Sequence, residues 1–178
     1  MFKLVAVWLF LLSTCVAAQE WTRFRGPNGD GNSTTQLPAQ WEPSDYAWIV
    51  DLPGIGHSSP VIWGDRLFVQ SADPDTGTQY LLCLNAETGK TFWKEEMEAA
   101  RYHIHARNSF ASSTPTVDKD AVYFAWATPD RIRLFCYSHD GEEIWSQQDL
   151  GPYASQHGFG SSPMLAGDFV VLPNLQMP

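Results

Sequence analysis

The fold of this chain is decided by the stretch LCLNAETGKTFW at residues 82–93. It recurs as FCYSHDGEEIW at residues 135–145, one residue shorter in the turn. In both copies an apolar run with a cysteine at its second position leads into a turn that contains a glycine, and a tryptophan ends the copy. Such self-similarity along the chain is the signature of a repeat protein.

The segment that opens each unit recurs as well. It reads SSPVIWGDRLFV at residues 58–69, STPTVDKDAVYF at 113–124 and SSPMLAGDFVV at 161–171. Successive prolines of this segment are 55 residues (115 − 60) and 48 residues (163 − 115) apart. Both spacings are close to the length of propeller blades, which is about 40–50 residues.

Each unit contains four short runs of β-branched and aromatic residues, separated by turns rich in Gly, Asp and Asn. In the first unit these runs are 59–63, 66–72, 79–85 and 91–97. Four strands per unit at this period predict an all-β fold, a β-propeller of four-stranded antiparallel blades. Trp93 and Trp145 end equivalent strands, where we expect them to be buried wedges between neighbouring blades.

The stretch AETGKTFW at 86–93 resembles the tryptophan-ended repeat of the pyrroloquinoline-quinone-like (PQQ-like) propeller family. Residues 21–27, WTRFRGP, resemble the mature N-terminus of its secreted bacterial members. That family includes quinoprotein alcohol and glucose dehydrogenases and the lipoprotein of the outer-membrane β-barrel assembly machinery. Its propellers have about eight blades. The resemblance therefore implies a fragment of a longer propeller, an incomplete ring of about two and a half blades that further C-terminal blades would complete.

We expect three parts along the chain: a signal peptide at 1–18, an N-terminal extension at 19–46 and an incomplete propeller at 47–178. Within the propeller we expect a lone strand, a first blade, a second blade and the start of a third. Their ranges are 47–52, 59–97, 113–149 and 161–178.

The first eighteen residues have the pattern of an export signal. Lys3 precedes the apolar run Leu4–Leu12, which is too short to span a bilayer comfortably, and small residues come before Gln19. We expect cleavage after Ala18 and a mature chain in the periplasm or outside the cell, with no transmembrane segment. Two alternatives stay open: an uncleaved anchor, and lipidation at Cys15, which would give an outer-membrane lipoprotein.

Composition and charge indicate which kinds of molecule this chain can bind. The chain is 44% hydrophobic and 17% charged, which are globular values. Its net charge is -9, and its basic residues are scattered singly without forming a stripe. A nucleic acid is therefore excluded as a partner, which leaves a protein or a small-molecule ligand.

Only Cys83 and Cys136 remain after cleavage of the signal. An exported chain can form disulfides, but these cysteines occupy one repeat position on successive blades. That places them a blade apart, whereas a disulfide requires Cα atoms within about 7 Å. We expect two unpaired thiols packed inside the blades.

The resemblance also raises the question of a cofactor. In the family's alcohol dehydrogenases the quinone PQQ stacks on a tryptophan, is capped by a disulfide between adjacent cysteines, and is polarised by calcium bound to Glu, Asn and Asp oxygens. This sequence has no adjacent cysteine pair. We therefore identify no catalytic, cofactor-binding or metal-binding residue, and PQQ and calcium find no support in these residues.

Five polar residues in the connectors between blades form the candidate ligand site: His57, His105, Arg107, Asn108 and His157. His103 lies in the same connector as the middle three. Propeller topology brings such connectors together around one mouth of the central channel. Converging His, Arg and Asn side chains can hold a metal or an anionic ligand. The alternative is that each side chain hydrogen-bonds backbone groups and ties adjacent blades together.

The sequence leaves three alternative functions for this chain. The leading hypothesis is a non-catalytic exported scaffold or binding protein that acts through loops at one mouth of the channel. The runner-up is the N-terminal part of a quinone-dependent dehydrogenase, whose catalytic residues would follow Pro178. The third is an envelope protein-assembly factor similar to the barrel-assembly lipoprotein.

Overall fold

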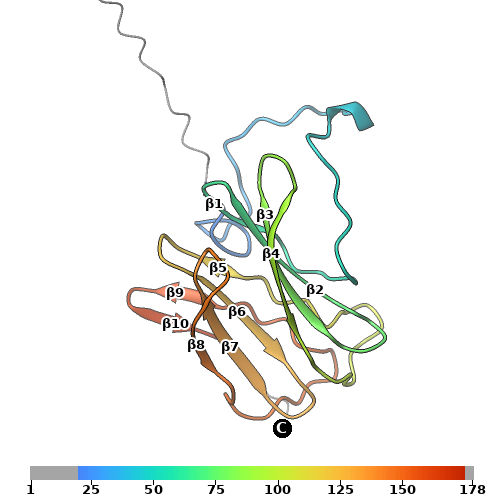
Figure 1. The fold of residues 1–178 in the computed structure, drawn as a ribbon, viewed down its shortest axis with the longest axis vertical. Coiled ribbons are helices and arrows are strands. Elements are labelled where there is room, and N and C mark those ends of the chain that lie inside the picture. Colours follow the sequence, from blue (N-terminus) through green and yellow to red (C-terminus); the bar gives the residue numbers. More distant parts are fainter. Residues whose placement is uncertain (1–19, 175–178) are drawn as a thin grey trace, which may run out of the picture.

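The computed structural model describes residues 20–174, in which every strand pairing is antiparallel (Figure 1). The first sheet contains, in order, β1 (Val61–Trp63), β2 (Arg66–Ala72), β3 (Gln79–Asn85) and β4 (Thr91–Met97). The second contains β5 (Thr116–Val117), β6 (Val122–Ala127), β7 (Ile132–Tyr137) and β8 (Glu143–Gln147). A third pairs β9 (Met164–Ala166) with β10 (Phe169–Val171), and the short 3-10 helix η1 (Pro43–Asp45) precedes all three.

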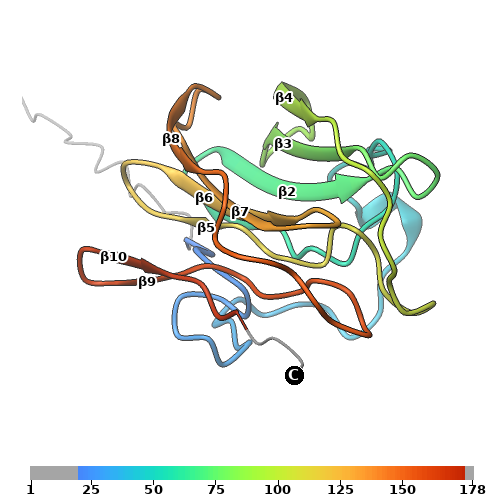
Figure 2. The ribbon, with the colours of Figure 1, turned by 90° about the horizontal axis from the view of Figure 1, so that it is seen from below.

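The three sheets lie on one another as layers, with the second between the first and the third (Figure 2). The prediction of an all-β fold built from four-stranded antiparallel blades is confirmed, with two full blades, one partial blade and a ring that does not close within residues 20–174. β2, β3 and β4 have the predicted bounds. The predicted signal peptide lies outside the described residues.

Residues 47–52, the predicted lone strand, form no strand in the structure. A strand is defined by hydrogen bonds to a neighbour, and no strand of the described part of the chain pairs with this segment, although Trp48 and Leu52 pack on the side chains of β2 and β3. Trp48 is nevertheless fixed. Its indole N–H donates to the Ala86 carbonyl at 3.1 Å, and its ring lies against Gly89 in the turn between β3 and β4.

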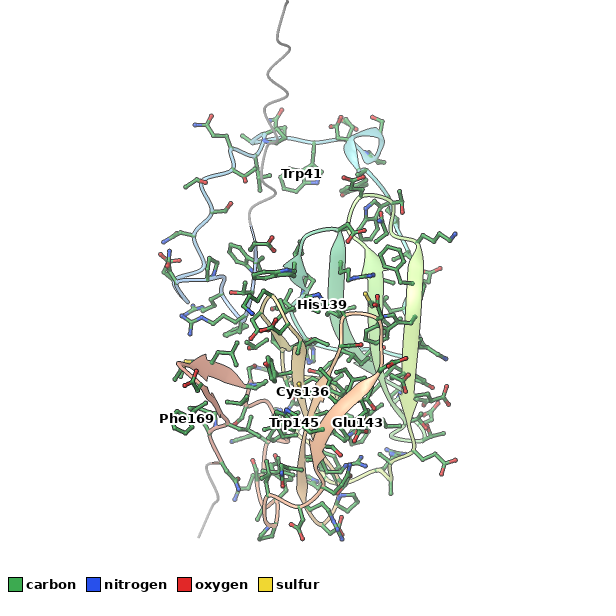
Figure 3. All side chains as sticks on the ribbon, turned by 60° about the vertical axis from the view of Figure 1, so that its left-hand side comes forward. Trp41, Cys136, His139, Glu143, Trp145 and Phe169 are labelled. Carbon is green, nitrogen blue, oxygen red and sulfur yellow. The ribbon has the colours of Figure 1, made fainter. Side chains whose placement is uncertain are left out.

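Trp93 repeats this arrangement one blade further along. Its indole N–H donates to the carbonyl of His139 at 2.8 Å, and its ring lies against Gly141 in the corresponding turn of the second blade. The predicted wedge position is therefore correct for Trp93, but the ring is only half-buried, because it lies near the outer edge of the blades. Trp145 is also half-buried and lies beside Cys136 on the neighbouring strand (Figure 3).

The main core fills the interface between the two full blades. Its large buried members come from both sheets and include Phe68, Leu81, Phe124, Trp126 and Phe135. Two buried glutamines cross the same interface: the amide of Gln70 donates to the Ala125 carbonyl at 3.2 Å, and that of Gln79 donates to the Ala127 carbonyl at 2.8 Å. Because a buried carbonyl is costly to leave unpaired, these bonds favour one relative placement of the blades.

The Ser/Thr-Pro segments that open each unit also join blades. The N–H of Ser59 donates to the Thr114 hydroxyl at 3.0 Å, and the N–H of Thr114 donates to the Ser162 hydroxyl at 3.0 Å. These three residues occupy one repeat position, immediately before the proline. The repeated hydroxyl is therefore the acceptor for the backbone of the preceding blade.

Replacing Thr114 by valine should lower the free energy of unfolding by about 1–3 kcal/mol, because it leaves the Ser59 N–H without its acceptor at nearly constant volume. Urea unfolding of the protein measures this change. Thr91→Val, the same replacement at an exposed position of β4, is the control and should change stability by less than about 0.5 kcal/mol. Equal effects of the two substitutions would contradict the assigned role.

The N-terminal segment lies along the first strands of the blades. Trp21 exchanges two backbone hydrogen bonds with Ile62 of β1, at 3.1 and 2.8 Å. The Val117 N–H of β5 donates to the Thr22 carbonyl at 2.9 Å. This segment is near the β1–β2 turn, where the Glu20 carboxylate accepts the Gly64 N–H. The connectors between blades lie at the opposite end of the strands, which we call the connector end.

Candidate functional site

The connector end is formed by the segment before β1 and by the two connectors, residues 98–115 and 148–163. Backbone hydrogen bonds hold these segments together: the N–H groups of His57 and Ser58 both donate to the Ala111 carbonyl at 2.9 Å. The N–H of His105 donates to the His157 carbonyl at 3.3 Å. All five predicted site residues belong to these segments.

Asn108 is the centre of the polar network. Its amide N–H donates to the His157 carbonyl, which ties the first connector to the second. Its side-chain oxygen accepts the Ser109 N–H at 2.9 Å and the hydroxyl of Ser112. Both polar atoms of this side chain have partners within the protein, so Asn108 positions the connectors.

His57 joins the network through Ser112, whose hydroxyl oxygen is 3.4 Å from His57 Nδ1. A serine beside a histidine raises the question of nucleophilic catalysis. The hydroxyl of Ser112, however, is closer to two other acceptors, the side-chain oxygen of Asn108 and the carbonyl of Ser109. The contact with His57 is the longest of the three, so it does not identify a nucleophile and its base.

The rings of His105 and His157 meet edge to face, with centroids 5.6 Å apart. Nδ1 of His105 accepts the Arg107 N–H at 3.1 Å, so the neutral ring carries its proton on Nε2. The structure thus brings together His57, His105, Asn108 and His157.

A cleft of about 370 Å³ lies beside this network, between the first connector and the end of β2. Its polar lining includes Arg101, His103, His105, Asn108 and Ser109. Its apolar lining includes Ile55, Pro74, Tyr102, Ile104 and Phe110. Of the five predicted residues only His105 and Asn108 line it, so the structure places His57, Arg107 and His157 outside the cleft. Arg101 and Tyr102 are lining residues that the sequence patterns did not single out.

The aromatic groups under the connectors form a continuous chain. Tyr102 contacts Phe110 and Tyr153 edge to face, with centroids 5.1 and 5.6 Å apart, and Tyr153 contacts Phe159 at 5.8 Å. Burial raises the pKa of Tyr102 well above its ordinary value, and the neighbouring Tyr153 raises it further. The Tyr102 hydroxyl therefore stays neutral in the pH range of a living cell.

Both cysteines are buried and unpaired, as the repeat predicted. They occupy equivalent places, since Cys83 pairs across the ladder with Trp93 and Cys136 pairs with Trp145. Burial raises the pKa of the Cys83 thiol to about 12 and that of the Cys136 thiol to about 11. Neither thiol has the thiolate character of a reactive cysteine.

Native protein at pH 8 should therefore resist thiol-specific reagents, because only the thiolate reacts and its fraction is very small at these pKa values. Full unfolding in guanidinium should release two reactive thiols per mature chain. A disulfide-exchange assay with a coloured leaving group measures both states. Rapid reaction in native buffer would contradict the assigned burial.

Trp93 and the two cysteines do not form the quinone site that the resemblance implies. A quinone needs a free aromatic shelf, but the Trp93 ring is covered by Gly141 of the next blade and its N–H is bonded to a carbonyl. Cys83 and Cys136 are on different sheets and cannot form a cap of adjacent cysteines. Within residues 20–174 no three His, Cys, Asp or Glu side chains are grouped as metal ligands.

The stacked four-stranded sheets with tryptophan-ended repeats define a β-propeller of PQQ-like blades. The family model described as outer membrane protein assembly factor BamB matches residues 41–175, and the chain belongs to this PQQ-like repeat family. No curated protein sequence matches it.

The crystal structure of BamB from Moraxella catarrhalis is similar to this chain, with a TM-score of 0.54 and 16% sequence identity. The match covers 71% of this chain and 36% of that structure, so the chain spans about a third of its length. At this identity the similarity shows the fold alone. Among the described residues, no helix is both long and apolar enough to cross a membrane.

Proposed function

We propose that this chain is the binding part of an exported β-propeller, which takes its ligand in the cleft at the connector end. The observation that carries the proposal is the cleft itself, about 370 Å³ in volume, where apolar and polar groups from one connector converge beside two packed blades. Small-ligand sites combine apolar surface with a few placed polar groups, and this cleft offers both. Blades fixed by buried cross-blade bonds supply the rigid base that such a site needs.

A non-catalytic role is favoured by the hydrogen bonds of the network. The Ser112 hydroxyl is closer to Asn108 and to the Ser109 carbonyl than to His57, and both polar atoms of the Asn108 side chain have partners within the protein. These side chains hold the connectors in place, while the neighbouring lining residues remain available to a ligand.

A thermal-shift screen with neutral, cationic and anionic small molecules tests this proposal. The wild-type protein is compared with Ala106→Trp, in which an indole fills the cleft from an exposed lining position. We expect compounds that raise the melting temperature of the wild type and leave that of the filled variant unchanged. If no compound distinguishes the two proteins, the cleft is not a ligand site.

The family match favours a second candidate, a part in the assembly of outer-membrane proteins. Deleting the gene in its native host should then lower the amount of folded outer-membrane β-barrel proteins. Unchanged levels in the deletion strain would argue against this role.

Export itself is a further part of the proposal, and it rests on the N-terminal sequence. The mature protein should begin at Gln19, because a charged start and a short apolar run precede the small residues that end at Ala18. N-terminal sequencing of exported protein is the measurement. A lipid-modified Cys15 at the N-terminus would show that the chain is a lipoprotein instead.

A further inference from the structure

The charge of the connector-end cleft is opposite to that of the chain. The chain carries 20 acidic and 11 basic residues. The ionisable side chains that line the cleft are Arg101, Tyr102, His103 and His105, and no lining residue is acidic. Asp73 is next to the lining residue Pro74, but its carboxylate accepts the N–H groups of Asp75 and Thr76 in its own turn.

The lining side chains offer hydrogen-bond donors. Arg101 is exposed and forms no ion pair with any residue of the described chain, so its guanidinium is available. His105 accepts the Arg107 N–H at Nδ1, which leaves the proton on Nε2 as a donor. Because burial raises the pKa of Tyr102, its phenol adds no negative charge.

Apolar groups complete the lining. Ile55, Pro74, Ile104 and Phe110 present carbon surface to the same hollow. Its volume of about 370 Å³ is at the small end of the range for ligand pockets, roughly 300–1,000 Å³. The cleft therefore has room for a compact ring system but not for an extended polymer.

We propose that the cleft binds a small organic anion, in which a carboxylate, sulfonate or phosphate group lies against Arg101 and His105 and a compact apolar body lies against Ile104 and Phe110. This proposal rests on the proposed function and adds the chemical class of the ligand. Charge-assisted hydrogen bonds from a guanidinium to an oxyanion are stronger than neutral ones, so Arg101 contributes most of the preference for an anion.

Two fluorescent probes with one aromatic skeleton test the proposal. 8-Anilinonaphthalene-1-sulfonate carries a sulfonate, and N-phenyl-1-naphthylamine is the same skeleton without it. We expect the sulfonate probe to bind the wild-type protein about tenfold more tightly than the neutral probe. Added sodium chloride should weaken the sulfonate probe alone, because salt screens charge and not apolar contact.

Substitutions in and beside the cleft show where the two probes bind. Arg101→Gln should weaken the sulfonate probe about tenfold and change the neutral probe by less than about twofold. Arg107→Gln is the matched control, since it removes the same charge from the same connector at a position that does not line the cleft. It should leave both affinities within about twofold of the wild type. Ala106→Trp, which fills the cleft, should abolish specific binding of both probes.

The outcomes distinguish a cleft without a preference for anions from a cleft that binds no ligand. Equal affinity for both probes, lost in Ala106→Trp, would overturn the anion preference while leaving a ligand site in the cleft. Probe binding that survives in Ala106→Trp, or no binding of the sulfonate probe to the wild type, would overturn the anion site. If the thermal-shift screen also fails to separate the filled variant from the wild type, the proposed function fails too.

Discussion

Replacing Trp126 by alanine should lower the free energy of unfolding by about 3–5 kcal/mol, the range for deleting a large buried aromatic side chain. Trp126 is 1% exposed and belongs to the core shared by the first and second blades. Its loss would leave a cavity between two sheets that are rigid enough to resist collapse. Chemical unfolding followed by circular dichroism measures the change.

Two variants make this prediction specific. Trp126→Phe keeps a ring in the interface, and the indole N–H that it removes has no partner in the described structure, so it should cost only about 1–2 kcal/mol. Trp41→Ala deletes the same side chain from a loop outside the blades, where it is 59% exposed, and should cost less than about 0.5 kcal/mol (Figure 3). A Trp126→Ala protein as stable as Trp41→Ala would show that the blade interface is not the main core.

The second large effect concerns the contact between Trp93 and Gly141. Trp93→Ala should cost about 3 kcal/mol, because the half-buried ring loses its contacts and its hydrogen bond to His139. Gly141→Ala should also be strongly destabilising, since Gly141 has φ of 93° and an added Cβ would lie 2.9 Å from the Trp93 ring.

A double-mutant cycle separates the two causes of the Gly141→Ala effect. Without the Trp93 ring only the backbone strain remains, so Gly141→Ala in the Trp93→Ala protein should cost about 1–2 kcal/mol and less than in the wild type. Strict additivity would mean that the ring does not pack on this glycine. His157→Ala, at an exposed connector position, is the control and should leave stability nearly unchanged.

The strands were predictable because their signals are local. Short runs of β-branched, aromatic and other apolar residues, bounded by turns that contain glycine, give β2, β3 and β4 their bounds without reference to the rest of the molecule. Recurrence likewise identified Cys83 and Cys136 as separate, unpaired thiols. Residues 47–52, predicted as a lone strand, form no strand within residues 20–174, because a strand also requires a neighbour to pair with, and a single segment of sequence does not contain that information.

The site was partly predictable for the same reason. The sequence placed four interacting residues in the connectors, and propeller topology brought those connectors together. It did not distinguish Arg107, which lies outside the cleft, from Arg101, which lines it, since that depends on the path of an irregular loop. Loops carry no periodic pattern that would show which side chains face inward.

By itself the sequence determined the repeat, the four-stranded blade and the equivalence of its cysteines and tryptophans. Only the tertiary structure identified the tryptophan that fills the core. Phe68 pairs with Cys83 and Tyr123 pairs with Cys136, so Phe68 and Tyr123 are equivalent positions in the two blades. Trp126 therefore corresponds to Ser71 of the first blade, and the repeat pattern does not predict a tryptophan at that position. The two positions differ because each face of a blade meets a different neighbour, and the volume to be filled is a property of the packed pair of sheets.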